Sequence, residues 1–167
     1  MVLGMSLATF TLVHVVISLI GIVSGILVLF GLLGSNRMSG MTAIFLLTTI
    51  LTNATGFLFP FEGFKPSYVI AGLSLVLLAI ACIALYAMKL RGAWRWIYVL
   101  TAMLSLYFNI FVLVIQSFLK VPFLHALAPS VPPSEPPFAA VQGLVLLFFV
   151  LVIIGGIRRF RPPATFA

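Results

Sequence analysis

The sequence predicts an all-α fold: a polytopic membrane helix bundle with five transmembrane helices, an outside N-terminus and a cytoplasmic C-terminus. Composition is the first reason. Of 167 residues, 63% are hydrophobic and 7% are charged, whereas a soluble surface needs roughly a quarter of its residues charged. The spacing of the basic residues is the second reason, because Lys and Arg are retained on the cytoplasmic side during membrane insertion.

The basic residues gather in segments that alternate with apolar runs. Lys65 and Lys120 share predicted outer loops with the acids Glu62 and Glu135. The other seven are all predicted to be cytoplasmic: Arg37, Lys89, Arg91, Arg95, Arg158, Arg159 and Arg161. A net charge of +7 would suggest nucleic acid as the partner of a soluble protein. Here the charges flank apolar runs, so the expected partners are the lipid bilayer and its anionic headgroups, and no nucleic acid.

The first predicted span covers residues 7–33 and ends at a polar turn that contains Arg37. At about 1.5 Å per residue it is long enough to cross a hydrocarbon core of about 30 Å. The apolar run is too long for a secretory signal, and Arg37 follows it instead of preceding it. We therefore expect a retained first helix.

Four further spans are predicted at residues 41–58, 68–88, 96–119 and 138–157, which makes 1–167 a single transmembrane domain. Pro66 supports the start of the third span because proline suits the first turn of a helix. The fifth span is apolar almost all round, so we expect it at the periphery, facing lipid.

The outer loop at residues 120–137 holds six of the ten prolines. It is too rich in proline for a long helix, yet its segment 123–127 is too apolar for a solvated linker. We expect a short interfacial segment followed by an extended stretch, together capping the outer end of the bundle.

Polar side chains in the spans share helical faces and a common depth. On the first span, His14, Ser18, Gly21 and Gly25 lie on one face. Because a polar group is costly in lipid, it tends to face a protein interior or a cavity. The predicted topology puts the imidazole and amide groups between the midplane and the outer surface. The sequence therefore predicts an outward-facing polar pocket, with these ligand-binding residues: His14, Asn53, Asn109, Gln116, Tyr68 and Gln142.

Structural roles are open alternatives for several of these positions. Gly21 and Gly25 fit close helix packing, and Asn53 and Asn109 fit hydrogen bonds between helices. For three hydroxyl residues we expect hydrogen bonds to backbone carbonyls: Thr49, Thr101 and Ser105.

His14 is the only histidine within a span, and its charge changes near neutral pH. It fits a proton site, a metal or haem ligand, or a neutral imidazole hydrogen-bonded to Asn53 or Gln116. Haem with two axial histidines would need His125 of the outer loop to fold into the bundle. Copper would use His14 and His125 with Met1 and Met5 on the outer side.

No catalytic constellation is evident in the spans. They contain no carboxylate, so the sequence favours a role other than catalysis. The single cysteine, Cys82, excludes an intrachain disulfide and a cysteine metal cluster. No motif names a cofactor.

Three segments resemble those of small, functionally uncharacterised bacterial inner-membrane proteins: Thr52–Phe57, Arg95–Leu100 and Glu135–Phe138. The resemblance implies an inner (plasma) membrane location and no activity. Size and span number are also similar to those of the tryptophan-rich sensory (translocator) proteins. This chain departs from them with only two tryptophans, so their function is not carried over.

The sequence thus favours an integral inner-membrane protein whose outward-facing pocket binds or conducts a small molecule or ion. A pore would need a homo-oligomer, because five helices are few for a channel in one subunit. The alternative is a non-catalytic accessory subunit of a larger membrane complex. A lesser alternative is a haem- or copper-binding redox membrane protein.

Overall fold

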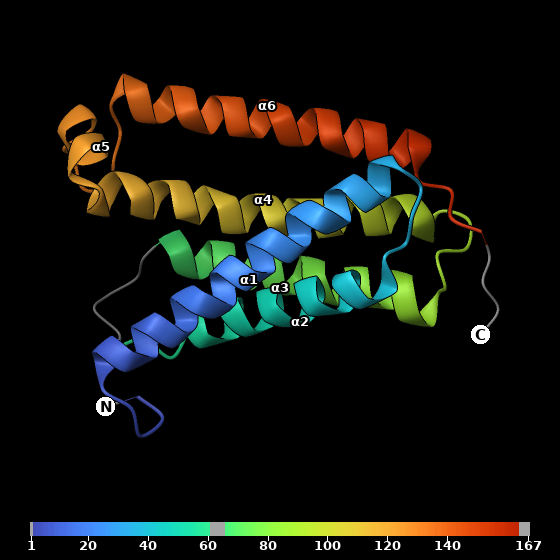
Figure 1. Cartoon of the computed structure of the whole chain (residues 1–167), viewed down its shortest axis with the longest axis horizontal. Coiled ribbons are helices and arrows are strands. Elements are labelled where there is room, and N and C mark those ends of the chain that lie inside the picture. Colours follow the sequence, from blue (N-terminus) through green and yellow to red (C-terminus); the bar gives the residue numbers. More distant parts are fainter. Residues whose placement is uncertain (1, 61–65, 164–167) are drawn as a thin grey trace.

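The computed structural model describes residues 2–60 and 66–163, and its elements are all helical. A π-helical turn, η1, continues α3. The elements are α1 (Leu7–Leu33), α2 (Ser39–Gly56), α3 (Pro66–Cys82), η1 (Ile83–Ala87), α4 (Trp94–Lys120), α5 (Pro122–Leu127) and α6 (Pro136–Arg159). The long helices run back and forth between the same two ends of the bundle, so that α1 begins and α6 ends at opposite ends (Figure 1).

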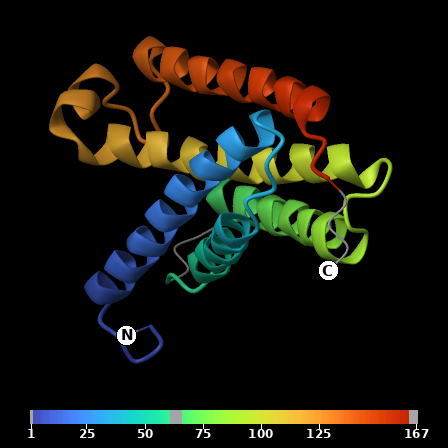
Figure 2. The ribbon, with the colours of Figure 1, turned by 45° about the vertical axis from the view of Figure 1, so that its right-hand side comes forward.

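Helix α4 is central to the bundle. It packs against α1, α2, α3 and α6, while α1 and α2 form an antiparallel hairpin (Figures 1 and 2). Helix α6 contacts α4 and the last turns of α1 and is otherwise exposed. The expectation that the last predicted span, residues 138–157, lies at the periphery is confirmed.

Within the described residues, four helices are long and apolar enough to cross a membrane: Leu7–Leu33, Ser67–Ala87, Trp94–Lys120 and Pro136–Arg159. The chain is therefore a multi-pass membrane protein. Helix α2 covers most of the second predicted span. With 18 residues it is about 27 Å long, close to the thickness of a hydrocarbon core. It also carries five threonines and one asparagine, which lower its hydropathy.

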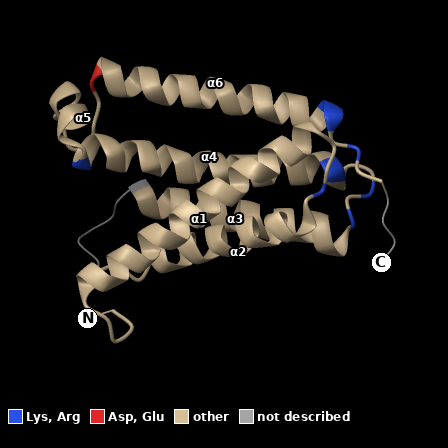
Figure 3. Cartoon of the chain, in the orientation of Figure 1, with Lys and Arg blue, Asp and Glu red and all other residues tan. Residues whose placement is uncertain are grey.

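The basic residues gather at one end of the bundle (Figure 3). This basic end holds Arg37, Lys89, Arg91, Arg95, Arg158, Arg159 and Arg161. The acid Glu135 and Lys120 lie at the opposite end, whereas Glu62 and Lys65 fall outside the described residues. The segregation that the sequence predicts is therefore present in the fold.

The helix of the third predicted span, residues 68–88, ends close to the expected position, but its last turn has a form that the sequence did not predict. The helix continues to Ala87 as a π-turn, closed by the Met88 amide donating to the Ile83 carbonyl at 2.8 Å. The chain then reverses through Lys89 and Leu90, which have φ angles of 50° and 58°. Such left-handed conformations are rare outside glycine, so residue type did not indicate them.

The loop before α6 is organised by Glu135. Its carboxylate accepts hydrogen bonds from the Ser130 amide and hydroxyl and from the Ser134 amide. These bonds lower the pKa of Glu135 to about 2. The loop contains a short helix, α5, at the place where the sequence predicts a short interfacial segment. It packs on the end of α4 and covers only that part of the bundle, away from the start of α1 (Figures 1 and 2).

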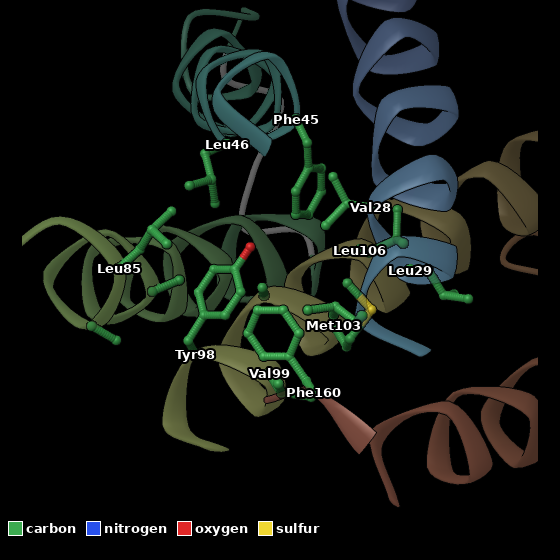
Figure 4. Packing of buried hydrophobic residues seen from close by; sticks show 14 of the residues in the cluster. Val28, Leu29, Phe45, Leu46, Leu85, Tyr98, Val99, Met103, Leu106 and Phe160 are labelled. Carbon is green, nitrogen blue, oxygen red and sulfur yellow. The ribbon is translucent and has the colours of Figure 1, made fainter. Parts of the chain in front are cut away.

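An apolar core fills the half of the bundle nearer the basic end (Figure 4). Tyr98 and Phe160 lie at its basic end, with ring centroids 6.0 Å apart. The other labelled members are Val28, Leu29, Phe45, Leu46, Leu85, Val99, Met103 and Leu106. The polar side chains of α1 and α2 that lie farther from the basic end form the candidate site.

Candidate functional site

A polar seam runs between α1, α2 and α4, from the end opposite the arginines to the middle of the bundle. We define it as His14, Ser18, Gly21, Thr49, Thr55 and Asn109. The seam follows from the α1–α2 hairpin. Residues at equal sequence distances from the turn near Ser35 meet in an antiparallel pair, which brings His14 beside Thr55 and Gly21 beside Thr49.

His14 forms the part of the seam farthest from the basic end. Its Nδ1 lies 2.8 Å from the hydroxyl of Thr55, and that hydroxyl also donates to the carbonyl of Leu51 at 2.7 Å. Because the single proton of that hydroxyl is donated to the Leu51 carbonyl, Nδ1 donates to Thr55, and in the neutral form of the ring Nε2 is then the acceptor. The ring of Phe59 meets the imidazole edge to face at 5.1 Å. His14 is therefore held in one tautomer beside an aromatic side chain.

The middle of the seam contains two polar atoms without partners. The Oδ1 of Asn109 accepts a hydrogen bond from Ser18 at 3.0 Å, but its Nδ2 has none. The hydroxyl of Thr49, a fully buried residue, has none either. Both atoms lie within 3.5 Å of the position that a Cβ of Gly21 would take. Each buried polar atom without a partner costs about 1 to 3 kcal/mol.

The hydroxyl predictions are therefore correct at two positions and wrong at the third. Thr101 donates to the Ile97 carbonyl and Ser105 to the Thr101 carbonyl, at 2.8 and 2.9 Å. Thr49 was expected to do the same and does not. The carbonyl of Thr49 instead accepts from the amide of Asn53 at 2.8 Å.

Asn53 lies beside the seam and links α2 to α3. Its Nδ2 donates to the Thr49 carbonyl and, at 3.2 Å, to the hydroxyl of Ser74. Asn109 likewise links α4 to α1 through Ser18. The expected hydrogen bonds between helices are confirmed for both asparagines. The expectation that His14 bonds Asn53 or Gln116 is wrong, because its partner is Thr55.

Three predicted binding residues lie outside the seam. Gln116 is exposed on α4, and Tyr68 stacks on Phe57 at 5.8 Å between ring centroids. Gln142 of α6 is buried and donates to the carbonyl of Phe111 at 3.1 Å. Residues 109 and 111 point to nearly opposite sides of α4, so Gln142 and Asn109 are separated by that helix.

Apolar packing closes the seam toward the basic end. A Cβ at Gly25 would lie 2.6 Å from Cδ1 of Leu106 and 2.9 Å from the ring of Phe45. Both side chains are fully buried. The predicted role of Gly25 in close helix packing is confirmed. The polar seam therefore ends at the middle of the bundle.

The two histidines lie on different helices, His14 on α1 and His125 on α5. Of the predicted copper ligands, Met5 precedes α1, and Met1 is outside the described residues. Across residues 2–60 and 66–163, no three His, Cys, Asp or Glu side chains form a group that would hold a metal ion.

Sequence reasoning missed Thr55 and gave Thr49 the wrong partner. The signal for both was the hairpin register. Pairing residues at equal distances from Ser35 aligns Gly25 with Phe45, Gly21 with Thr49, and His14 with the turn that contains Thr55. A search along single helical faces does not use that register.

Comparisons with protein-family models, with curated proteins and with solved structures give no match to this chain. The polar seam is therefore the feature of the molecule that indicates a function.

Proposed function

We propose that the protein is a five-span inner-membrane protein that binds a small polar molecule from the outer side, at the polar seam. The single observation that carries this proposal is the pair of buried atoms without partners, Asn109 Nδ2 and Thr49 Oγ1, both within 3.5 Å of the position that a Cβ of Gly21 would take. Two such atoms are costly within a membrane, and one guest that bonds both would remove that cost.

The proposed topology places the basic end in the cytoplasm and the N-terminus outside. Seven Lys and Arg residues at that end support it, as does the antiparallel course of α2 beside α1. Helix α2 then crosses the membrane as the second of the five spans. Its polar residues are tolerated because the seam lies between helices and not against lipid.

Labelling of single cysteines with a membrane-impermeant thiol reagent tests this topology. In a Cys82→Ala background, we expect Ser67→Cys to react in intact cells. Asn36→Cys and Arg91→Cys should react only after permeabilisation. All three native residues are exposed in the structure. Labelling of positions 36 and 67 from the same side would show that α2 does not cross and would overturn the five-span topology.

The chemistry of the seam favours an uncharged guest. The amide of Asn109 donates, the hydroxyl of Thr49 donates or accepts, and Nε2 of His14 accepts. Its described side chains include no carboxylate, lysine or arginine to balance an ion. A small neutral molecule with a carbonyl or hydroxyl group matches these donors and acceptors.

The packing at Gly25 favours binding over conduction. Leu106 and Phe45 fill the space beyond the partnerless atoms, and the apolar core follows. A polar molecule that reached Asn109 from the outer side would meet hydrocarbon next. We therefore propose a binding site closed toward the cytoplasm.

Accessibility of the seam to water-borne reagents tests the site. We expect a small, charged methanethiosulfonate added outside to modify Ser18→Cys much faster than Ser24→Cys. Ser18 is half-buried beside Asn109, whereas Ser24 is buried deeper on the same helix and donates to the Ile20 carbonyl. The outer control is Ser67→Cys. If Ser67→Cys reacts and Ser18→Cys does not react from either side, the seam only links helices.

The alternative function, an accessory subunit of a larger complex, is supported by α6. Only 17% of an apolar 18-residue stretch of this helix is buried, the lowest share among the four candidate spans. Co-purification of a stoichiometric partner in mild detergent would favour the subunit. Loss of that partner on Leu147→Arg, at an exposed position of α6, would place the contact on this helix.

A further inference from the structure

We propose that the groove between α1, α4 and α6 binds one acyl chain of an anionic phospholipid, whose headgroup lies on Arg158 and Arg159. The groove has a volume of about 310 Å³. Its lining is entirely apolar and comes from three helices: Ile26, Leu29 and Phe30 of α1, Ile110 of α4, and Leu144, Val145, Phe148 and Phe149 of α6.

The lining determines the chemistry of the occupant. An apolar space of this kind is unfavourable for water and for any polar group that it cannot hydrogen-bond. The groove lies between helices that are long and apolar enough to span a membrane, so the hydrocarbon of the bilayer surrounds its opening. Phe30 and Leu144 are 63% and 68% exposed and form that opening. An acyl chain enters from the side, between α1 and α6.

The groove is closed toward the basic end. There Gly155 and Gly156 let α6 approach its neighbours closely. A Cβ at Gly155 would lie 3.0 Å from Leu33, and one at Gly156 would lie 2.8 Å from Val99. An acyl chain that starts at the basic end therefore passes this contact on the lipid side of α6 and enters the groove only beyond it.

The charge at the basic end selects the headgroup. Arg158 and Arg159 are exposed at the end of α6, and the described acid, Glu135, is bonded to serines at the opposite end. From Phe148 to Arg158 is ten residues, or about 15 Å along the helix. That is about half of a 30 Å hydrocarbon core, the depth that one acyl chain spans. A phosphate on these arginines thus brings the far end of its acyl chain to Phe148 and Phe149, the part of the α6 lining nearest the basic end.

Native mass spectrometry of the purified chain with phosphatidylglycerol or phosphatidylcholine of identical acyl chains tests the proposal. We expect phosphatidylglycerol to bind about tenfold more tightly than phosphatidylcholine. Arg158→Gln with Arg159→Gln should abolish this preference and leave binding of phosphatidylcholine unchanged. Leu144→Trp, which fills the groove, should weaken both lipids several-fold.

The matched control is Val150→Trp, six residues along the same helix, exposed and on the face opposite the groove lining. It should leave both affinities unchanged, and thermal unfolding of each variant shows that it is folded. Equal binding of the two lipids by the native chain would overturn the proposal. So would a Leu144→Trp variant that binds like the native chain, because the headgroup contact alone would then account for binding. A dimer that Leu144→Trp dissociates would also overturn it, since a second copy would then occupy the groove.

Discussion

Gly25→Ala is expected to lower the free energy of unfolding by about 1 to 3 kcal/mol, the range for overpacking a filled core. The added methyl would lie 2.6 Å from Leu106 and 2.9 Å from Phe45, and both are fully buried with no free space to move into. Helix α1 would have to move away from α2 and α4. The change is measured by unfolding the purified protein in a detergent mixture of increasing denaturing strength.

Gly143→Ala is the matched control. Gly143 also lies within a long helix, α6, but no atom stands within 4 Å of the position of its added methyl. It should leave stability unchanged or raise it slightly, because alanine favours helix over glycine. If both alanine variants unfold at the same denaturant concentration, close packing at Gly25 does not hold α1 in place.

Phe160→Ala is expected to lower the free energy of unfolding by about 3 kcal/mol, because it removes a fully buried aromatic side chain. Phe160 follows the last turn of α6 and packs beside Tyr98 (Figure 4). Arg95 of α4 holds the same segment by donating to the carbonyls of Ile157 and Phe160, at 3.2 and 2.5 Å. The same unfolding titration measures the loss.

The control is Phe123→Ala, which removes an aromatic ring that is 72% exposed and should have little effect on the free energy of unfolding.

Arg95→Met, and the double variant that combines it with Phe160→Ala, complete a thermodynamic cycle. Since Arg95 and Phe160 hold one segment, their effects should be less than additive. Strict additivity would show that the two contacts act independently.

Much of the fold could be predicted from the sequence because polar turns separate long apolar runs. The bounds of α1 agree with the prediction, and α4 begins two residues earlier and ends one later. The π-turn after Cys82 could not be predicted, since it depends on how the chain closes its turn at Leu90. The prediction of five spans requires that α2 also crosses the membrane. Its threonines make it the most polar of the long helices.

The site was predicted less completely. A helical face groups residues on one helix but does not say which neighbour they meet. Asn109 and Gln116 are seven residues apart on α4 and were predicted to line one pocket. Helix α1 crosses α4 near Asn109 and diverges beyond it (Figure 2), so Gln116 is left exposed. The pairing of His14 with Thr55 depends on the hairpin register in the same way.

A density map of the protein in a lipid nanodisc tests the central claim most directly, at the space between Asn109, Thr49 and Gly21. We expect non-protein density within hydrogen-bond distance of both Asn109 Nδ2 and Thr49 Oγ1, and its loss in an Asn109→Leu variant. If the map shows these two atoms bonded to each other or to backbone carbonyls, with nothing between them, the seam is a link between helices and the proposed binding site is wrong.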